Sequence, residues 1–402
     1  MNPTLARDQF PALKEKAFLD SACVSLAPLA SVNAIREFLD IVSLCPAPSS
    51  TDHHIMLDDM RSKARVQVAK LIECAEDEVA LVESTSQGLN IAADALPLQR
   101  GDRILMSDME FMEVGIPWCQ KQSAVGIEID VVPNWRGQVR VQDLADRVTP
   151  RTKAVVISAV EWSNGFRVDL AALSGLCRNH SMYLIVDAIQ QLGAVPISVR
   201  ATPIDILACG GHKWLNSPFG TGFLYIRKGL LPELRRPLAG YLSVEPPEGG
   251  WGNYFQTPSI TPVREYRYVE EARRFETGGT SNYPGAIGLA ASLKLLLQLG
   301  QEATATYIQD LAAYLAAGLE RQGVEIVTPL ESNHRSGITT FTLGSQQKNV
   351  EAMQFLLKRK VLTSVRYTSG IGGVRVSCHL FNNREDIDQL LSHLQAFLRG
   401  TA

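Results

Sequence analysis

The sequence lacks several features that would assign it to a specialised class of protein. No apolar run is long enough to span a membrane, because the most apolar stretch, residues 285–300, is interrupted by Lys294. The 39 Lys and Arg residues are scattered and the net charge is −3, so no basic patch indicates nucleic acid or an anionic membrane as a partner. The first twenty residues contain no apolar segment of signal-peptide length. We therefore expect a soluble, cytoplasmic protein.

Cysteine, glycine and histidine patterns exclude further classes. The seven cysteines are dispersed, odd in number and never in a C-x-x-C pair, which indicates reduced thiols and not a disulfide framework. A nicotinamide oxidoreductase would show G-x-G-x-x-G after an early strand, and the glycines at residues 370–373 come too late and are too few. The His and Asp residues at 52–59 superficially resemble a metal cluster, but a polar helix start explains them, so we predict no metal site.

Short apolar runs alternate with amphipathic segments through the first two-thirds of the chain. This pattern predicts a mostly parallel sheet covered by helices on both faces. The predicted strands are residues 79–82, 103–106, 127–132, 154–158, 183–186, 204–208 and 222–226, and the predicted helices between them are 87–95, 114–122, 141–148 and 170–180.

The pattern of apolar and polar residues changes near residue 284, and a chain of 402 residues is long for a single hydrophobic core. Two helices and then alternating short strands and helices predict a small α+β domain with an antiparallel sheet. We expect a large domain at residues 17–283, a small domain at 284–402, and an N-terminal segment, 1–16, that packs on the small domain. Residues 232–262 are rich in Pro, Gly and aromatics and predict a functional loop.

Lys213 stands in an unusual setting for a solvated charge. It lies in the sequence Gly210-Gly211-His212-Lys213-Trp214, directly after a predicted strand. The two glycines permit close backbone approach, and His212 could donate to a phosphate oxygen. A lysine here is suited to condense with an aldehyde, which makes pyridoxal phosphate the candidate cofactor.

Other polar residues follow predicted strands at the edge where α/β sheets bind ligands. Each has a plain structural alternative. Asp187 could pair with a pyridine nitrogen or cap a helix, and Ser84, Thr85, Ser86 and Gln87 could hold a phosphate or form an ordinary N-cap. Asn164 begins an Asn-Gly turn signal, and Phe111 could stack on a ring or simply fill the core.

Taken together, these pieces resemble the class V aminotransferase family of fold-type I pyridoxal phosphate enzymes. This group includes cysteine desulfurases, selenocysteine lyases, kynureninases and isopenicillin N epimerase-like proteins. The resemblance extends over nearly the whole chain and is carried by residues 18–22, 186–190, 209–213, 274–280, 375–377 and 381–383. It implies a fold-type I large domain with a mostly parallel seven-stranded sheet, plus a small C-terminal α+β domain.

The resemblance also implies roles for individual residues. Lys213 would carry the cofactor as a Schiff base and act as the general acid and base, and Arg375 would clamp the substrate α-carboxylate. Asp187 would pair with the pyridinium, while Asn164 and Gln190 would contact the phenolic oxygen. The phosphate would be held by Thr85, Ser86, His212 and Ser84 or Gln87, with Phe111 against the ring. Thr280 would reach the phosphate of a neighbouring subunit, so a homodimer is expected.

The chain departs from cysteine desulfurases at two places. Residues 365–373, where desulfurases carry a nucleophilic cysteine, contain none, and Cys378 is predicted to be a packing residue on the opposite face of its strand. Phe111 stands where desulfurases stack a histidine, and a phenyl ring cannot deliver protons.

We therefore expect an enzyme that acts on an α-amino acid through a quinonoid intermediate. A Cβ–S or Cβ–X lyase without a persulfide cysteine is the leading hypothesis. Transamination and epimerisation, or another α-carbon reaction, share the same intermediate and remain open. A non-catalytic protein that retains the fold is the more remote alternative.

Overall fold

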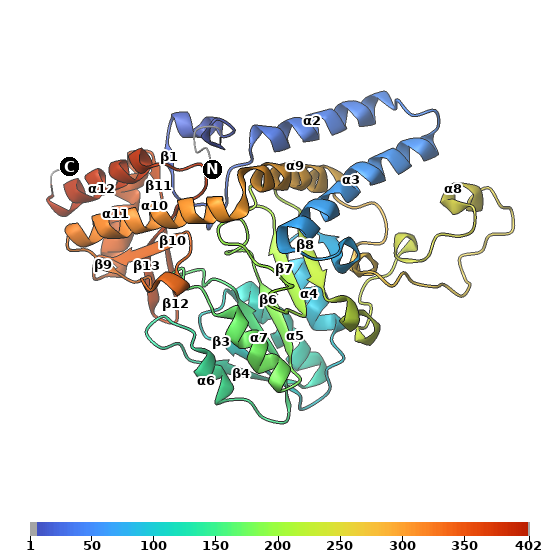
Figure 1. Cartoon of the computed structure of the whole chain (residues 1–402), viewed down its shortest axis with the longest axis horizontal. Helices are drawn as coiled ribbons and strands as arrows, with labels where there is room; N and C mark the ends of the chain where they lie inside the picture. The colour runs from blue at the N-terminus through green and yellow to red at the C-terminus, as the bar shows by residue number, and fades with distance from the viewer. Residues whose placement is uncertain (1–5, 401–402) are drawn as a thin grey trace.

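The computed structural model describes residues 6–400, in which a large sheet and a smaller one form separate layers and a third sheet has only two strands (Figure 1). The larger sheet has seven strands, as predicted. In spatial order they are β2 (Val79–Val82), β8 (Gly222–Ile226), β7 (Ile206–Gly210), β6 (Tyr183–Asp187), β5 (Thr152–Ser158), β3 (Arg103–Ser107) and β4 (Glu128–Val132). Strand β8 runs antiparallel to both of its neighbours, whereas the remaining pairs are parallel.

Alternation along these strands divides the buried side chains into two cores. In β5, Val155 and Ile157 belong to one core, while Ala154 and Val156 belong to the other. The first core is closed by α3 (Ser50–Ile72), α7 (Leu170–Asn179) and α9 (Tyr283–Leu299), and the second by α4 (Thr85–Ala95) and α5 (Met112–Val125). Helices on both faces explain why the strands are nearly continuous apolar runs.

The smaller sheet is antiparallel, in the order β12 (Ser364–Thr368), β13 (Ile371–Ser377), β10 (Ile338–Thr342) and β9 (Glu325–Ile326). Three helices pack with it around a third core: α10 (Gln301–Arg321), α11 (Gln346–Lys358) and α12 (Arg384–Leu398). The predicted α/β and α+β classes of the two parts are thus confirmed.

The remaining elements connect or extend these layers. Two strands pair in parallel, β1 (Ala17–Phe18) and β11 (Val361–Leu362). The other helices are α2 (Leu29–Leu44), α6 (Val141–Ala145) and α8 (Gly250–Tyr254). Short 3₁₀ turns are η1 (Pro11–Lys14), η2 (Glu76–Glu78), η3 (Lys228–Glu233), η4 (Tyr241–Ser243), η5 (Ala272–Phe275) and η6 (Ser332–His334).

The predicted domain limits stay predictions, although the contacts near them are informative. Helix α9 begins at the predicted limit, yet its buried side chains lie in the first core of the large sheet. At the N-terminus, Arg7 pairs with Asp386 at 2.8 Å and Phe10 packs on Phe381, both in the small domain; residues 1–5 lie outside the described residues. Within residues 6–400, none of the helices is long and apolar enough to cross a membrane.

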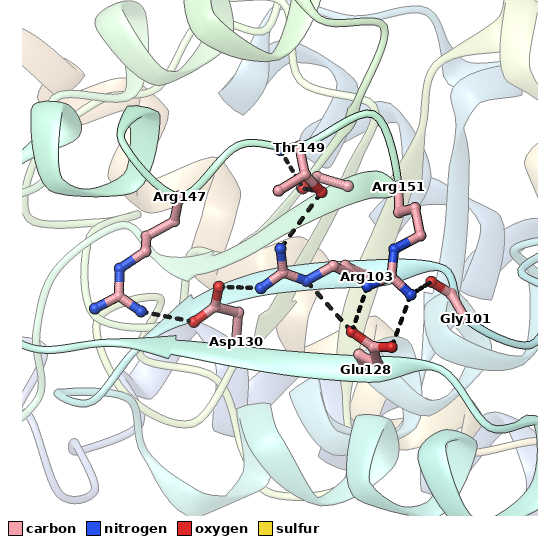
Figure 2. A network of polar contacts seen from close by, with 8 residues as sticks. Gly101, Arg103, Glu128, Asp130, Arg147, Thr149 and Arg151 are labelled. Carbon is pink, nitrogen blue, oxygen red and sulfur yellow. Dashed lines mark hydrogen bonds and ion pairs between the residues drawn. The ribbon is translucent and has the colours of Figure 1, made fainter.

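Ion pairs cover the outer edge of the large sheet, at β3 and β4 (Figure 2). Arg103 on β3 pairs with Asp130 and Glu128 of the edge strand. Arg147 and Arg151, from the loop that precedes β5, reach the same two carboxylates. Charged side chains along an edge strand disfavour pairing with another chain.

Candidate active site

The candidate residues come together because their strands end at one edge of the large sheet. Strands β2, β3, β5, β6 and β7 run in the same direction, so their carboxyl ends share that edge. The candidate residues at or after these ends are, in the same order, Thr85, Phe111, Asn164, Asp187 and Lys213. This is the edge at which open α/β sheets bind ligands.

The backbone before Lys213 lies tightly against the start of α4. The Gly210 N–H donates to Thr85 Oγ1 at 2.8 Å, and a Cβ on Gly210 would lie 2.9 Å from the same oxygen. A Cβ on Gly211 would approach Ser217 Cβ to 2.7 Å. Glycine is therefore required at both positions for this close packing, as the sequence suggested.

The Lys213 amine lies in an environment that favours its neutral form. Burial lowers its pKa to about 8, Asp187 opposes that shift, and Arg375 adds to it. The amine lies 5.9 Å from the centre of the Phe111 ring. A lysine with a lowered pKa is a competent nucleophile towards a carbonyl group.

Asp187 is the last residue of β6 and is buried. Its Oδ1 accepts a hydrogen bond of 2.9 Å from the Ile189 N–H, which fixes the orientation of the carboxyl group. Burial raises the pKa of Asp187 to about 6, against the opposing effects of this hydrogen bond and of Lys213. At neutral pH the group is mostly ionised, as the partner of a protonated ring nitrogen must be.

The first turn of α4 offers backbone N–H groups to an anion, but some of its side chains are engaged. Ser84 is the N-cap and accepts from the Gln87 N–H at 3.1 Å, while Gln87 Oε1 accepts from the Glu83 N–H at 2.6 Å. Thr85 and Ser86 follow the cap directly. This helix start is compatible with both an ordinary N-cap and a phosphate site. A well-capped first turn still presents the positive end of its dipole to a phosphate.

His212 lies beside Lys213 and stacks on Phe219 at 5.4 Å between ring centres. Burial and the nearby Lys213 lower the pKa of His212 to about 4. The ring is therefore neutral at physiological pH and retains one N–H for donation.

The side-chain amides of Asn164 and Gln190 each form hydrogen bonds within the protein through both the nitrogen and the oxygen. Asn164 Nδ2 donates to the Gly137 carbonyl at 2.7 Å, and its Oδ1 accepts from the Phe166 N–H at 3.0 Å. Gln190 Nε2 donates to the Ala22 carbonyl, and its Oε1 accepts from Trp214 Nε1, at 2.9 and 2.8 Å. Each amide nitrogen keeps a second hydrogen for a ligand, so the predicted contact remains compatible with these bonds.

Arg375 lies on β13 with 1% of its surface exposed. It donates to the Trp162 carbonyl at 2.9 Å and to Asp20 Oδ1 at 3.2 Å. Burial lowers the pKa of its guanidinium. Arg375 thus forms a salt bridge with Asp20, and its charge also lowers the pKa of the Lys213 amine.

No described interaction connects Thr280 to the other predicted site residues within one chain. It is exposed and lies between η5 and α9. Its predicted role in a neighbouring subunit stays a prediction.

Two buried glutamates near the site were not predicted. Glu110 accepts from Ser158 Oγ at 2.5 Å, and burial raises its pKa to about 8. Glu161 is fully buried, and within the described chain its carboxyl oxygens have no hydrogen-bond partner, so its pKa is also raised. Glu110 comes shortly after the end of β3, and Glu161 comes shortly after the end of β5. A polar residue after a strand end is the signal that could have identified them.

Cys23 and Arg366 were also not predicted. Arg366 Nη2 lies 3.4 Å from Cys23 Sγ, and the thiol contributes to the electrostatic environment of both Lys213 and Arg375. Their positions depend on contacts between distant parts of the chain, which no local pattern reveals.

The stretch expected to match the desulfurase loop is a tight β-hairpin. Strands β12 and β13 are joined by Ser369 and Gly370 alone, at φ angles of 47° and 78°. Two consecutive positive φ angles are the mark of a type I′ turn. Cys378 is fully buried in the third core, and burial raises its pKa to about 12, in keeping with its predicted packing role.

A family model described as Aminotransferase class-V matches residues 17–390. The chain belongs to this family. It is accordingly a pyridoxal phosphate-dependent enzyme with the fold-type I architecture, as the resemblance implied. A cysteine desulfurase of Escherichia coli strain SE11 is 27% identical over 416 residues, which cover 98% of this chain and 97% of that protein.

Solved structures of the class V family share the fold. The apo cysteine desulfurase of Thermococcus onnurineus NA1 superposes with a TM-score of 0.87 at 23% identity, covering 99% of this chain and 98% of that one. The cystine C–S lyase C-DES, in complex with cysteine persulfide, superposes with a TM-score of 0.86 at 24% identity, covering 96% and 99%.

The described residues fit pyridoxal phosphate. Lys213 supplies an amine whose pKa burial lowers to about 8, and Asp187 supplies an ionised carboxylate at the next strand end. The start of α4 lies against Gly210, where a side chain would collide with Thr85. An amine, a carboxylate and an anion-binding helix start on one sheet edge are the services that this cofactor needs.

Proposed function

We propose that the enzyme is a Cβ–S or Cβ–X lyase that acts on an α-amino acid. The observation that carries the proposal is the buried Lys213 amine at the strand edge beside Phe111, whose pKa of about 8 responds to both Asp187 and Arg375. The names of the relatives support it, since cysteine desulfurases and a cystine C–S lyase cleave a carbon–sulfur bond. An aminotransferase and an epimerase are the alternatives, and a non-catalytic protein of this fold is the remote one.

Pyridoxal phosphate, when bound, withdraws electrons from the substrate α-carbon. Lys213 would hold the cofactor and then move a proton at the α-carbon through its Nζ atom. Asp187 would keep the ring nitrogen protonated, and the start of α4 with Thr85, Ser86 and His212 would hold the phosphate. Phe111 would pack against the ring and exclude water, and Arg375 would orient the substrate through its carboxylate.

Phe111 favours elimination over epimerisation. A lyase needs one proton-transfer group at the α-carbon, and Lys213 provides it. An epimerase needs a second group on the opposite face of the substrate. Phe111 cannot donate or accept a proton, and the Cys378 thiol is fully buried.

A substrate panel tests this proposal. Purified, cofactor-loaded enzyme is incubated with sulfur-containing and other β-substituted amino acids, and pyruvate, alanine, sulfide, keto acids and exchange of the α-proton are measured. We expect pyruvate and the released β-substituent in equal amounts. Keto acid formation that requires an acceptor would establish the aminotransferase instead. Racemised substrate without product would establish the epimerase.

We further propose a cytoplasmic homodimer in which Thr280 contacts the phosphate bound by the partner. The exposure of Thr280 next to α9 supports this role. Thr280→Val removes one hydrogen bond to a charged group, so we expect the cofactor dissociation constant to rise roughly ten-fold or more. Light scattering on the wild type and the variant checks the dimer, and a monomeric wild type would contradict the proposal.

A further inference from the structure

Arg366 and Arg375 lie on the same face of the small sheet. Arg375 is paired directly with Ser364, and Arg366 with Gly373, in the antiparallel register of β12 and β13. The two arginines are therefore diagonal cross-strand neighbours, a relation in which the residues are roughly 7–8 Å apart. Gly373, opposite Arg366, has no side chain that could cover the guanidinium.

Both arginines contact the same short segment, residues 20–23, which precedes α2. Arg375 donates to Asp20, and Arg366 lies against the Cys23 thiol at 3.4 Å. Gln190 holds this segment from the large domain through the Ala22 carbonyl. The segment therefore joins Arg366 to the candidate site, because Cys23 and Arg375 both act electrostatically on Lys213 and Arg366 acts on Arg375.

The two arginines differ in their ionic partners. Arg375 has Asp20 as a counterion. Arg366 has only the Val365 carbonyl and the Cys23 sulfur, and among residues 6–400 no carboxylate lies within ion-pair distance of it. By contrast, Arg61 is only partly exposed and pairs with the buried Glu276 at 2.7 Å. A half-buried guanidinium without a counterion is available to bind an anion.

We propose that Arg366 binds a second anionic group, located in the side chain of the substrate. The substrate class is then an α-amino acid whose side chain ends in a carboxylate or a sulfur oxyacid. Arg375 would take the α-carboxylate and Arg366 the distal group, each with the fork geometry that suits planar anions. This inference rests on the proposed function and specifies its substrate.

Calorimetric titration of the cofactor-loaded enzyme tests this assignment without turnover. The probes are succinate and glutarate, each compared with the monocarboxylate of equal chain length, butyrate or valerate. We expect the better dicarboxylate to bind at least roughly ten-fold more tightly, because it makes one additional charge-assisted contact. Arg366→Gln should reduce this preference to near one, and Arg366→Lys should retain part of it.

Arg399→Gln is the matched control, since Arg399 is exposed at the end of α12 and its change removes the same charge from the same domain. It should keep the wild-type preference. In steady-state assays, Arg366→Gln should raise the KM of acidic amino acids at least ten-fold while the KM of neutral ones changes little. Arg375→Lys should weaken the binding of monocarboxylates and dicarboxylates to the same extent.

The outcomes separate this inference from the proposed function. A wild type that contains cofactor but shows no dicarboxylate preference overturns the role of Arg366 and leaves the lyase intact. A preference that persists in Arg366→Gln overturns it as well. A protein that cannot be loaded with cofactor overturns the proposed function, and this inference with it.

Discussion

Replacing Lys213 with alanine is expected to abolish turnover and to remove the visible absorption band of the bound cofactor. The amine is the group that would attach the cofactor and move the substrate proton, so its loss removes two functions together. General acid and base catalysis alone contributes about 10² to 10⁴ in rate. The measurement is the visible spectrum before and after borohydride reduction, followed by mass spectrometry of the reduced peptide.

Lys121 provides the matched control for this experiment. It is a second buried lysine whose pKa is lowered by burial, and it donates to the carbonyls of Asp94 and Leu96. Lys121→Met should retain the absorption band, and borohydride should label Lys213 only. An alanine variant at position 213 that keeps a reducible band would refute the assignment.

The pKa of Lys213 also sets the pH at which the apoenzyme takes up its cofactor. Only the neutral amine attacks an aldehyde, and its fraction rises as the pH increases through about 8. Uptake should therefore become faster from pH 7 to pH 9. Below about pH 6 Asp187 becomes protonated, so the partner of the ring nitrogen is lost and the affinity should fall.

Asp187→Asn is expected to reduce kcat strongly while the fold is retained. The amide has the shape of the carboxyl group and can still accept from the Ile189 N–H, but it carries no charge to keep the ring nitrogen protonated. Removing one partner of a buried ion pair costs about 3–5 kcal/mol, which corresponds to roughly 10² to 5 × 10³ in rate. Steady-state kinetics and the thermal midpoint of the loaded variant are the measurements.

Glu110→Gln is the control for Asp187→Asn, because both changes replace a carboxyl group near the same sheet edge with its amide. The pKa of Glu110 is raised to about 8, so this group is already mostly protonated at pH 7. Glutamine copies that neutral form, and kcat should change less than ten-fold. Equal losses in the two variants would show that the charge of Asp187 has no special role.

The sequence predicted the large sheet well because its strands are short, apolar and separated by amphipathic helices. All seven predicted strands are present, within a few residues at each end. Helices α2 and α3 were not predicted. The buried side chains of α3 are confined to its last third, from Ala64 to Ile72, so its first half shows no apolar face. In α2, Leu39, Val42 and Leu44 are exposed, which conceals the buried face.

The site was predicted to the extent that its residues follow strands. Lys213, Asp187 and Thr85 occupy positions that a strand end and a local motif indicate together. Cys23 and Arg366 meet only because residues 20–23 contact the small domain, where Asp20 bridges to Ser377. Proximity of that kind arises from tertiary packing, and a single sequence contains no local sign of it.

The segment 20–23 has a consequence for how a newly synthesised chain becomes active. Asp20 and Arg375 are 355 positions apart, and the Ala22 N–H donates to Ser377 Oγ over the same separation. The early segment cannot reach these partners until the ribosome has translated nearly the whole message. Contacts of such long range form late in folding. A chain whose translation stops early would therefore contain Lys213 but lack Arg375, the predicted clamp of the substrate carboxylate.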